Sequence, residues 1–516
     1  MKLAMGKRIT VAVVCVLVAA AVIAALFFGA NAGTTRQGET AAGSTVPPSS
    51  TPLDTGNGEP DNTGTGQTPE PTGAKKVLNV YSYDDELELI INEYIRRNPG
   101  FDYEVRLFYT PLVDYYHTLS LINQNLPGDA EAVADIYCVP VAYASHFTKG
   151  EMSRYACTYK ELGIDVEAAL KKADIPQYVI DAGTNPDGEL IALPYKPYVH
   201  VFMYRRSIAR EVWGTDDPER ISEIIGGGTE SWDKFLQAAQ TLKKHGYYIV
   251  PGCHDLSLMI DTSIQAFSSD SDAVTWINPD WEDFMKISKA FYDQGFIGDI
   301  LPYGEEWSMA LNGKGDKPAF GFFIMLDFIN NTALDYYLRD TAGDWAICLP
   351  PFKTADGNVS AGVMVNRNSP HKEALGPLIE WITLDCSETG LQYLRATDTL
   401  YRQDAVGYHL YELAGGKKPV VSGTVLHNTS TDIAFLGGQN INPVVYGSQR
   451  TPSRVNHSYS SPQSGFFLAW FEETQAYIKG EKSKDAAVAD YLRRAEELAA
   501  GYKETFEEYG MSHLLP

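Results

Sequence analysis

The chain has 516 residues, 42 of them Lys or Arg and 66 Asp or Glu, and its formal net charge is −24 at pH 7. So acidic a protein is a poor partner for nucleic acid or an anionic membrane, because both are bound by basic patches. The length is too great for one compact core and suits two large lobes behind a leader.

The N-terminus predicts a signal peptide or a membrane anchor over residues 1–32. Basic residues precede an apolar run, residues 9–28, that is long enough to span a bilayer. Residues 30–32, Ala-Asn-Ala, fit a small-x-small cleavage site, so cleavage and retention both stay open. Cys15 lies inside the apolar run with no small residue before it, and we expect no lipid attachment there.

A flexible linker is predicted for residues 33–74. This stretch has no aromatic residue, and only Val46 and Leu53 are large aliphatics. It cannot bury enough apolar surface to fold, so it should behave as a tether. Together with the leader it places the folded part outside the cytoplasmic membrane, at the cell surface or in the periplasm, anchored or secreted.

Strands and helices then alternate. A strand at 77–81 is followed by a helix with apolar residues at helical spacing, which 98–100, Asn-Pro-Gly, should stop. A second strand at 103–109 leads into a helix ending near Leu126, and 134–139 is a third strand. This alternation predicts a mostly parallel, doubly wound sheet.

The rest of the chain continues the pattern. Further strands are predicted at 189–196, 198–205, 319–323 and 359–365, and helices at 233–245, 280–292, 307–311, 370–384, 467–478 and 484–509. The segment 423–465 is rich in Asn, Ser, Tyr and Gly and is predicted to be largely irregular.

Five cysteines lie beyond the leader. Their odd number and the absence of a CxxC spacing argue against a disulfide framework and a structural zinc site. One bridge, such as Cys138 to Cys157, stays open, but buried free thiols are favoured.

Several short motifs occur in order between residues 75 and 384. They are residues 77–100, 134–137, 193–195, 203–205, 231–235, 311–314, 319–322, 348–351 and 362–366. In this order and spacing the chain resembles the extracellular solute-binding proteins of ABC importers, the large family that includes maltose-binding protein. It departs from the family in lacking the usual lipid-attachment cysteine, in placing Phe322 where many relatives have Trp, and in the segment 423–465.

The resemblance implies two doubly wound α/β lobes joined by a multi-strand hinge, a fold like that of the type II periplasmic binding proteins. The first lobe would comprise 75–196 plus about 363–440, and the second 197–362 plus about 441–516. The resemblance further implies a monomeric, non-enzymatic protein without metal or cofactor. Its partners would be a small solute, a sugar and in particular an oligosaccharide, and the transmembrane subunits of an ABC permease.

Ten residues are candidate ligand contacts. A sugar packs its C–H face on aromatic rings and needs fixed acceptors for its hydroxyls, so carboxylates and aromatics are the sensible pairing. They are Tyr83, Asp84, Asp85, Tyr143, Tyr195, Trp232, Phe322, Phe323, Asp327 and Trp470. Each also has a plain structural alternative: the aspartates with Ser82 could only cap a helix, and the aromatics could only fill a core.

Other functions are less well supported. The sequence contains no HExxH and no GxSxG motif, and 312–315, Asn-Gly-Lys-Gly, lacks the remaining residues of a phosphate loop. A glycan-active hydrolase stays open, since a chain with 66 acidic residues always offers carboxylate pairs. A binding protein of the same fold for iron, polyamine or peptide is the other alternative.

Overall fold

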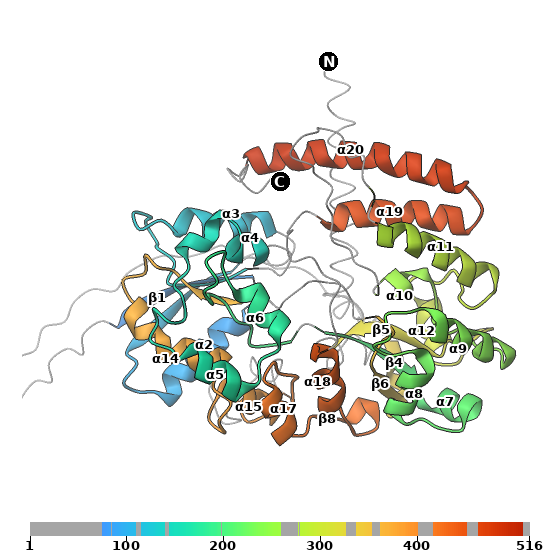
Figure 1. Ribbon diagram of the computed structural model, residues 1–516, viewed down its shortest axis with the longest axis horizontal. Helices are drawn as coiled ribbons and strands as arrows, with labels where there is room; N and C mark the ends of the chain where they lie inside the picture. Colours follow the sequence, from blue (N-terminus) through green and yellow to red (C-terminus); the bar gives the residue numbers. More distant parts are fainter. Residues whose placement is uncertain are drawn as a thin grey trace, which may run out of the picture.

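The computed structural model describes residues 75–83, 85–109, 115–139, 144–197, 199–257, 259, 277, 279–326, 337–352, 362–400, 416–450 and 463–508. The predicted leader and linker lie outside these ranges. No helix within them is both long and apolar enough to cross a membrane. Two sheets stand apart, each surrounded by helices (Figure 1).

The first sheet has the strand order β2-β1-β3-β7. Strands β1 (Lys76–Ser82), β2 (Tyr103–Tyr109) and β3 (Ile136–Cys138) are parallel, and β7 (Val363–Val365) is antiparallel to β3. The predicted parallel sheet is thus confirmed, with one returning strand added.

Helices cover both faces of this sheet. They are α2 (Glu86–Arg97), α3 (Tyr115–Asn125), α4 (Ala144–Thr148), α5 (Val166–Ala173), α6 (Gln177–Gly183), α14 (Lys372–Thr383) and α15 (Leu391–Ala396). Side chains of β1 alternate between the two apolar layers: Leu78 and Val80 pack on one side, and Tyr81 on the other. Burial on both faces explains why the strands read as nearly continuous apolar runs.

The second sheet has the order β5-β4-β6, from β4 (His200–Arg205), β5 (Gly321–Met325) and β6 (Trp345–Cys348). Strand β4 is antiparallel to both neighbours, so this sheet departs from a wholly parallel one. Parallel bridges of Tyr248 with Ala319 and of Val250 with Ile297 extend it beyond β5.

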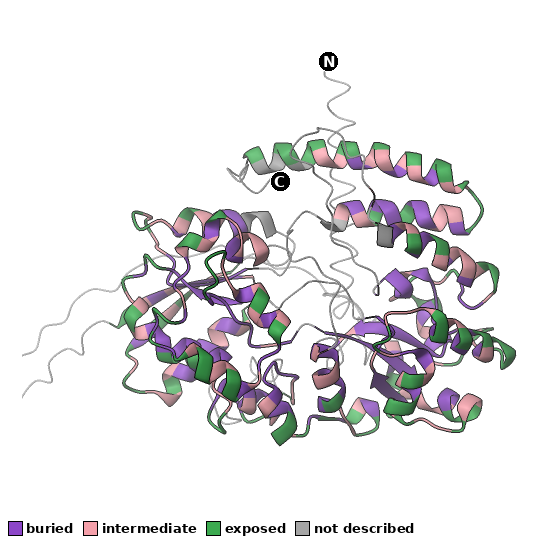
Figure 2. Cartoon of the chain, viewed as in Figure 1, coloured by how far each residue is buried: buried purple, intermediate pink, exposed green. Residues whose placement is uncertain are grey.

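Helices also cover the second sheet, which is buried on both faces (Figure 2). They are α7 (Arg206–Trp213), α8 (Pro218–Ile225), α9 (Asp233–Lys244), α10 (Cys253–Ser257), α11 (Pro279–Asp293) and α12 (Glu305–Leu311). The C-terminal helices α19 (Gln463–Ile478) and α20 (Lys484–Glu508) form an antiparallel pair, with α19 on α11 (Figure 1). The predicted final helices are confirmed.

The prediction of an irregular segment at 423–465 is wrong for its described part. This part contains α17 (Gly423–Asn428), a short strand pair β8 (Asp432–Ile433) and β9 (Gln439–Asn440), and α18 (Asn442–Arg450). Its polar residues hydrogen-bond to the backbone. The Ser422 hydroxyl caps α17 by accepting a hydrogen bond from the Val425 amide, and the Asn442 side chain donates to two carbonyls near the end of that helix. Ser and Asn indicate a loop in most sequences, because their side chains can replace the backbone hydrogen bonds of helices and strands.

Smaller differences concern strand limits and cysteines. Residues 189–196 form only isolated bridges, of Leu190 with Thr184 and of Leu193 with Val363, instead of a full strand. The five cysteines of the described residues are free thiols, so the bridge left open between Cys138 and Cys157 is not formed.

Gly376 tests how tightly α14 is seated. A Cβ there would overlap the carbonyl oxygen of Leu162, a backbone atom that no side-chain rotation can move away. We expect Gly376→Ala to lower the free energy of unfolding by about 1–3 kcal/mol, the usual cost of overpacking. Chemical denaturation measures this, and Gly100→Ala, where nothing lies within 4 Å, is the matched control. Equal stability of the two variants would contradict the packing described here.

Candidate functional site

The carboxyl ends of the parallel strands in the first sheet are level with one another. Ser82, the last residue of β1, pairs with Tyr109 at the end of β2 and with Cys138 at the end of β3. In open α/β sheets ligands bind beyond such ends, where loops leave the sheet. The residues that follow each strand are therefore the place to look for a site.

An equivalent edge exists in the second sheet. His200 at the start of β4 pairs with Met325 at the end of β5, so the chain enters this sheet at the edge where β5 leaves it. The entering segment, 193–199, begins beside the returning strand of the first sheet, since Leu193 bridges Val363. Two crossings between the lobes thus start side by side.

A buried cluster of charges lies next to these crossings. The Arg395 guanidinium is hydrogen-bonded to one carboxylate oxygen of Glu86, and the Lys196 amine lies 3.2 Å from the other oxygen. The Tyr195 hydroxyl donates to the latter oxygen at 3.5 Å, and Arg395 also lies over the Tyr195 ring. Arg395 is only 3% exposed and Glu86 17%.

The charge state of Glu86 follows from this environment. Burial alone would raise its pKa, but the positive charges of Arg395 and Lys196 outweigh burial and hold the pKa well below its usual range. The carboxylate is therefore ionised at any physiological pH. It joins the start of α2 to the first crossing and to α15.

Glu86→Gln should destabilise the protein by about 3 kcal/mol at pH 7, because it leaves the buried charge of Arg395 without a counter-ion. The pKa of Glu86 is lowered in the folded state, so its stabilising effect is complete above the unfolded pKa, near 4, and declines as the pH falls below it. Urea unfolding at pH 7 and pH 3 should therefore show a smaller difference between variant and wild type at the lower pH. A difference that is equal at both pH values would contradict this role.

The predicted contacts of the first lobe lie around the cluster. Tyr83 is half-buried and packs against the first-lobe core, and Asp85 is exposed at the start of α2 without a capping hydrogen bond from its side chain. Tyr195 is buried in the cluster itself. Asp84 and Tyr143 lie outside the described residues.

The predicted contacts of the second lobe lie within its core. Phe322 and Phe323 are each 2% exposed and point to opposite faces of the sheet. Trp232 is partly buried and packs on Phe352, and the buried Trp470 donates its Nε1–H to the Trp281 carbonyl. Asp327 lies outside the described residues. For all ten residues the ligand-binding role stays a prediction.

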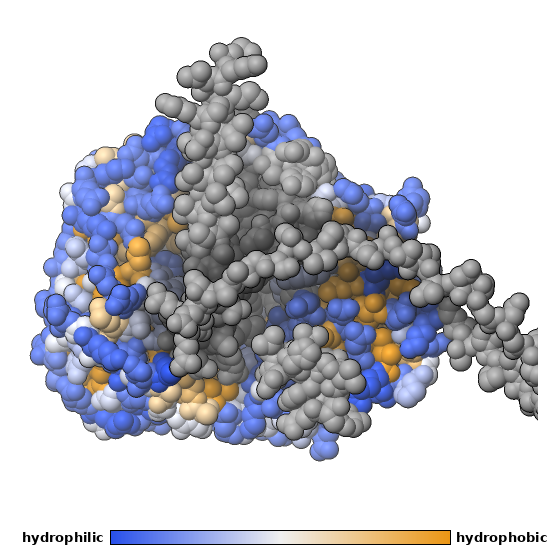
Figure 3. Space-filling view, turned by 180° about the vertical axis from the view of Figure 1, so that it is seen from behind, coloured by the Kyte–Doolittle hydropathy of each residue, from blue (hydrophilic) through white to orange (hydrophobic). Residues whose placement is uncertain are grey.

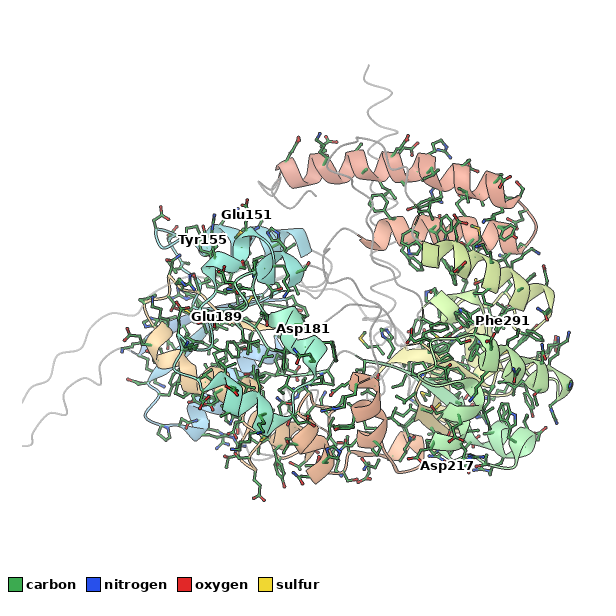
Figure 4. The ribbon with its side chains drawn as sticks, viewed as in Figure 1. Glu151, Tyr155, Asp181, Glu189, Asp217 and Phe291 are labelled. Carbon is green, nitrogen blue, oxygen red and sulfur yellow. The ribbon has the colours of Figure 1, made fainter. Side chains whose placement is uncertain are left out.

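Figure 4 places several polar side chains of the first lobe relative to the second. Asp181 on α6 lies on the side toward the second lobe, whereas Glu151 and Tyr155 lie at the top of the first lobe in this view. Among the described residues no three His, Cys, Asp or Glu side chains group closely enough to hold a metal ion.

Comparison with solved structures identifies the fold. A family 1 extracellular solute-binding protein matches with a TM-score of 0.57 and 13% identity, over 82% of this chain and all of that one. The chain has the fold of the extracellular solute-binding proteins. The sugar-binding protein MalE of Xanthomonas citri matches with a TM-score of 0.53 and 14% identity, over 84% and 99% of the two chains.

A third structure of similar fold is the galacto-N-biose-/lacto-N-biose I-binding protein of an ABC transporter from Bifidobacterium longum, in complex with lacto-N-biose. Its TM-score is 0.51 at 14% identity, over 85% of this chain and 99% of that one. No protein-family model and no curated protein sequence matches this chain. The predicted pair of α/β lobes is thus confirmed as the architecture of a solute-binding fold.

Sequence reasoning missed polar and aromatic residues at the carboxyl edge of the second sheet. Residues 248–250 run parallel to the chain at Ala319 and end at Pro251, and Asp255 on α10 follows. An apolar stretch followed by Pro-Gly and then by His254 and Asp255 is the signal that could have revealed this edge. Tyr303, before α12, belongs to the same edge of the solute-binding fold.

Phe322 is a test of the division between core and site. Its ring packs at 5.1 Å from that of Trp307 and at 5.7 Å from that of Trp345, all within one apolar layer. We expect Phe322→Ala to cost about 3–5 kcal/mol of stability through the cavity it leaves. Phe322→Leu should cost much less, and thermal unfolding compares the two. Wild-type stability of the Ala variant would show that the ring is free for a ligand.

Proposed function

We propose that this protein is the extracellular solute-binding component of an ABC importer and that it captures a carbohydrate, in particular an oligosaccharide, between its two lobes. One observation carries the proposal: the segments that connect the two lobes start beside the strand ends of both sheets. In such a fold a solute bound between the lobes contacts both, and closing buries it.

The solute class is supported by the proteins of similar fold. MalE is named a sugar-binding protein, and the Bifidobacterium protein was seen with lacto-N-biose. Both match this chain over nearly their whole length. The acidic net charge and the tether fit a protein held outside the membrane, next to a permease of transmembrane subunits.

We propose lobes close to the predicted ones, 75–196 with 363–422 and 197–362 with 441–516. The segment 423–440 is better described as a connector. At its start, the Ser422 hydroxyl donates to the Ala173 carbonyl of the first lobe, while Val425 and Leu436 pack in the layer that contains Val201 of β4. Because this segment contacts both lobes, we propose that it is part of the hinge.

The proposal predicts binding without turnover. The full chain, screened by thermal shift against neutral and acidic oligosaccharides, should show a raised melting temperature with at least one of them, because a ligand that binds only the folded state stabilises it. Calorimetry then gives the affinity, and chromatography of the mixture should return the sugar unchanged. Cleaved sugar would support the hydrolase alternative, and binding of ferric ion, polyamine or peptide with no sugar response would support the other.

A further inference from the structure

Three aromatic side chains form a compact group on the second lobe, which we call the aromatic triad: Tyr303, Trp307 and Tyr337. Their ring centroids lie 5.3 Å apart for Tyr303 and Trp307, 5.9 Å for Trp307 and Tyr337, and 6.1 Å for the two tyrosines. Each ring therefore contacts both others. Trp307 in turn packs against Phe322 of β5, so the triad rests on the second sheet.

The triad lies at the carboxyl edge of that sheet. Helix α12 ends at Leu311, and the chain then turns into β5, which ends at Met325. Since Trp307 packs on β5, the helix runs back along the strand, and Tyr303 before the helix comes to the end where β5 leaves the sheet. This is the edge at which solutes bind in the proposed function.

The backbone holds the two tyrosines in place. The Ser308 hydroxyl and the Asn312 side-chain amide both donate to the Tyr337 carbonyl, each at 2.7 Å. Tyr303 has a φ of 62°, in the left-handed region that a tyrosine rarely adopts. Such strain costs about 1–3 kcal/mol, and strained residues cluster at active sites, ligand clamps and switch regions.

The triad offers both surface and polar groups. Tyr303 and Tyr337 are partly exposed, and Leu301, two residues before Tyr303, is 57% exposed. Figure 3 shows apolar residues reaching the surface on both lobes, among mainly hydrophilic ones. Beneath the tyrosines the Nε1–H of the buried Trp307 has no hydrogen-bond partner among the described residues, although a buried unpaired donor costs about 1–3 kcal/mol.

Asp255 near Tyr303 is only 3% exposed, and its Oδ2 accepts a hydrogen bond from the Gly252 amide. Burial raises the pKa of its carboxyl to about 8, which favours the uncharged form at neutral pH, so that it adds no negative charge beside the triad. Burial first, and then Asp255 and Tyr337, raise the pKa of Tyr303 to about 12. The neighbouring His254 is neutral as well, because burial lowers its pKa to about 4.

We propose that Tyr303 and Tyr337, backed by Trp307, form a stacking platform for one pyranose ring of a neutral carbohydrate. This inference rests on the proposed function. The C–H face of the sugar packs on the tyrosine rings, and its hydroxyls exchange hydrogen bonds with the tyrosine hydroxyls. The charges near the platform in sequence are Glu305 and Glu306 on one side and Arg339 on the other, so no excess of positive charge favours an acidic sugar.

Calorimetry of single variants tests the platform, with the best neutral oligosaccharide from the screen and a uronic-acid analogue as the probes. Tyr337→Leu removes an aromatic face but keeps apolar volume, and it should weaken binding of the neutral sugar about tenfold, which equals about 1.4 kcal/mol. Tyr247→Leu is the control. Tyr247 is a partly buried tyrosine of the same lobe, whose hydroxyl donates to Glu211, and it lies at the opposite end of the strand that leads to Asp255. The affinity of Tyr247→Leu for the neutral sugar should stay within twofold of wild type.

Trp307→Phe gives an independent measurement. It removes an N–H that makes no hydrogen bond among the described residues, so the variant should fold. The neutral sugar should change the tryptophan fluorescence of the wild type, and much of that change should be lost in Trp307→Phe.

The outcomes separate the two proposals. If no carbohydrate binds the wild type, the proposed function fails. If a neutral sugar binds but Tyr337→Leu retains wild-type affinity and Trp307→Phe retains the fluorescence response, the platform is overturned while the proposed function stands. A preference of the wild type for the uronic-acid analogue would overturn the neutral class of solute.

Discussion

The arrangement of this protein depends on one buried carboxylate. Glu86 opens α2 in the first lobe, and its two oxygens are held by Arg395 from α15 and by Lys196 from the first crossing. These three positions are far apart in the sequence, so the cluster fixes where the chain leaves the first lobe. A buried charge without its partners costs several kcal/mol, and the three segments therefore have to stay together whenever the protein is folded.

The same constraint decides which parts can move. A second ion pair, Asp174 with Arg450, joins α5 to α18, and α18 packs on β4. Both pairs lie near the segments that connect the lobes, whereas the strand ends of the two sheets carry loops. A rotation between the lobes would thus pivot near these pairs and move the strand ends, as the proposed capture of a solute requires.

The sequence was sufficient where local pattern and tertiary burial agree. Strand β2 has the predicted limits, and α2 ends just before the predicted stop, because their apolar residues recur at the spacing of the face they bury. It was insufficient where polar residues serve the backbone, as Ser422 and Asn442 do around α17 and α18. For the site, the ligand-binding role of Tyr195 and of the other candidates stays a prediction. The sequence could not show that Phe322 and Trp470 are buried, because burial depends on packing between segments far apart in the chain.

The carboxyl-end edges of the two sheets differ in charge and in aromatic content. At the first edge the positive charges of Arg395 and Lys196 are balanced by the negative charges of Glu86 and of the exposed Asp85 beside it, so little electrostatic attraction is left for a solute. At the second edge the aromatic triad presents apolar area and neutral hydroxyl groups. In the proposed function, initial binding is then expected on the second lobe, through stacking, and closure follows when the first lobe supplies its polar side chains. A neutral solute is compatible with this order, because no net charge has to be buried when the lobes meet.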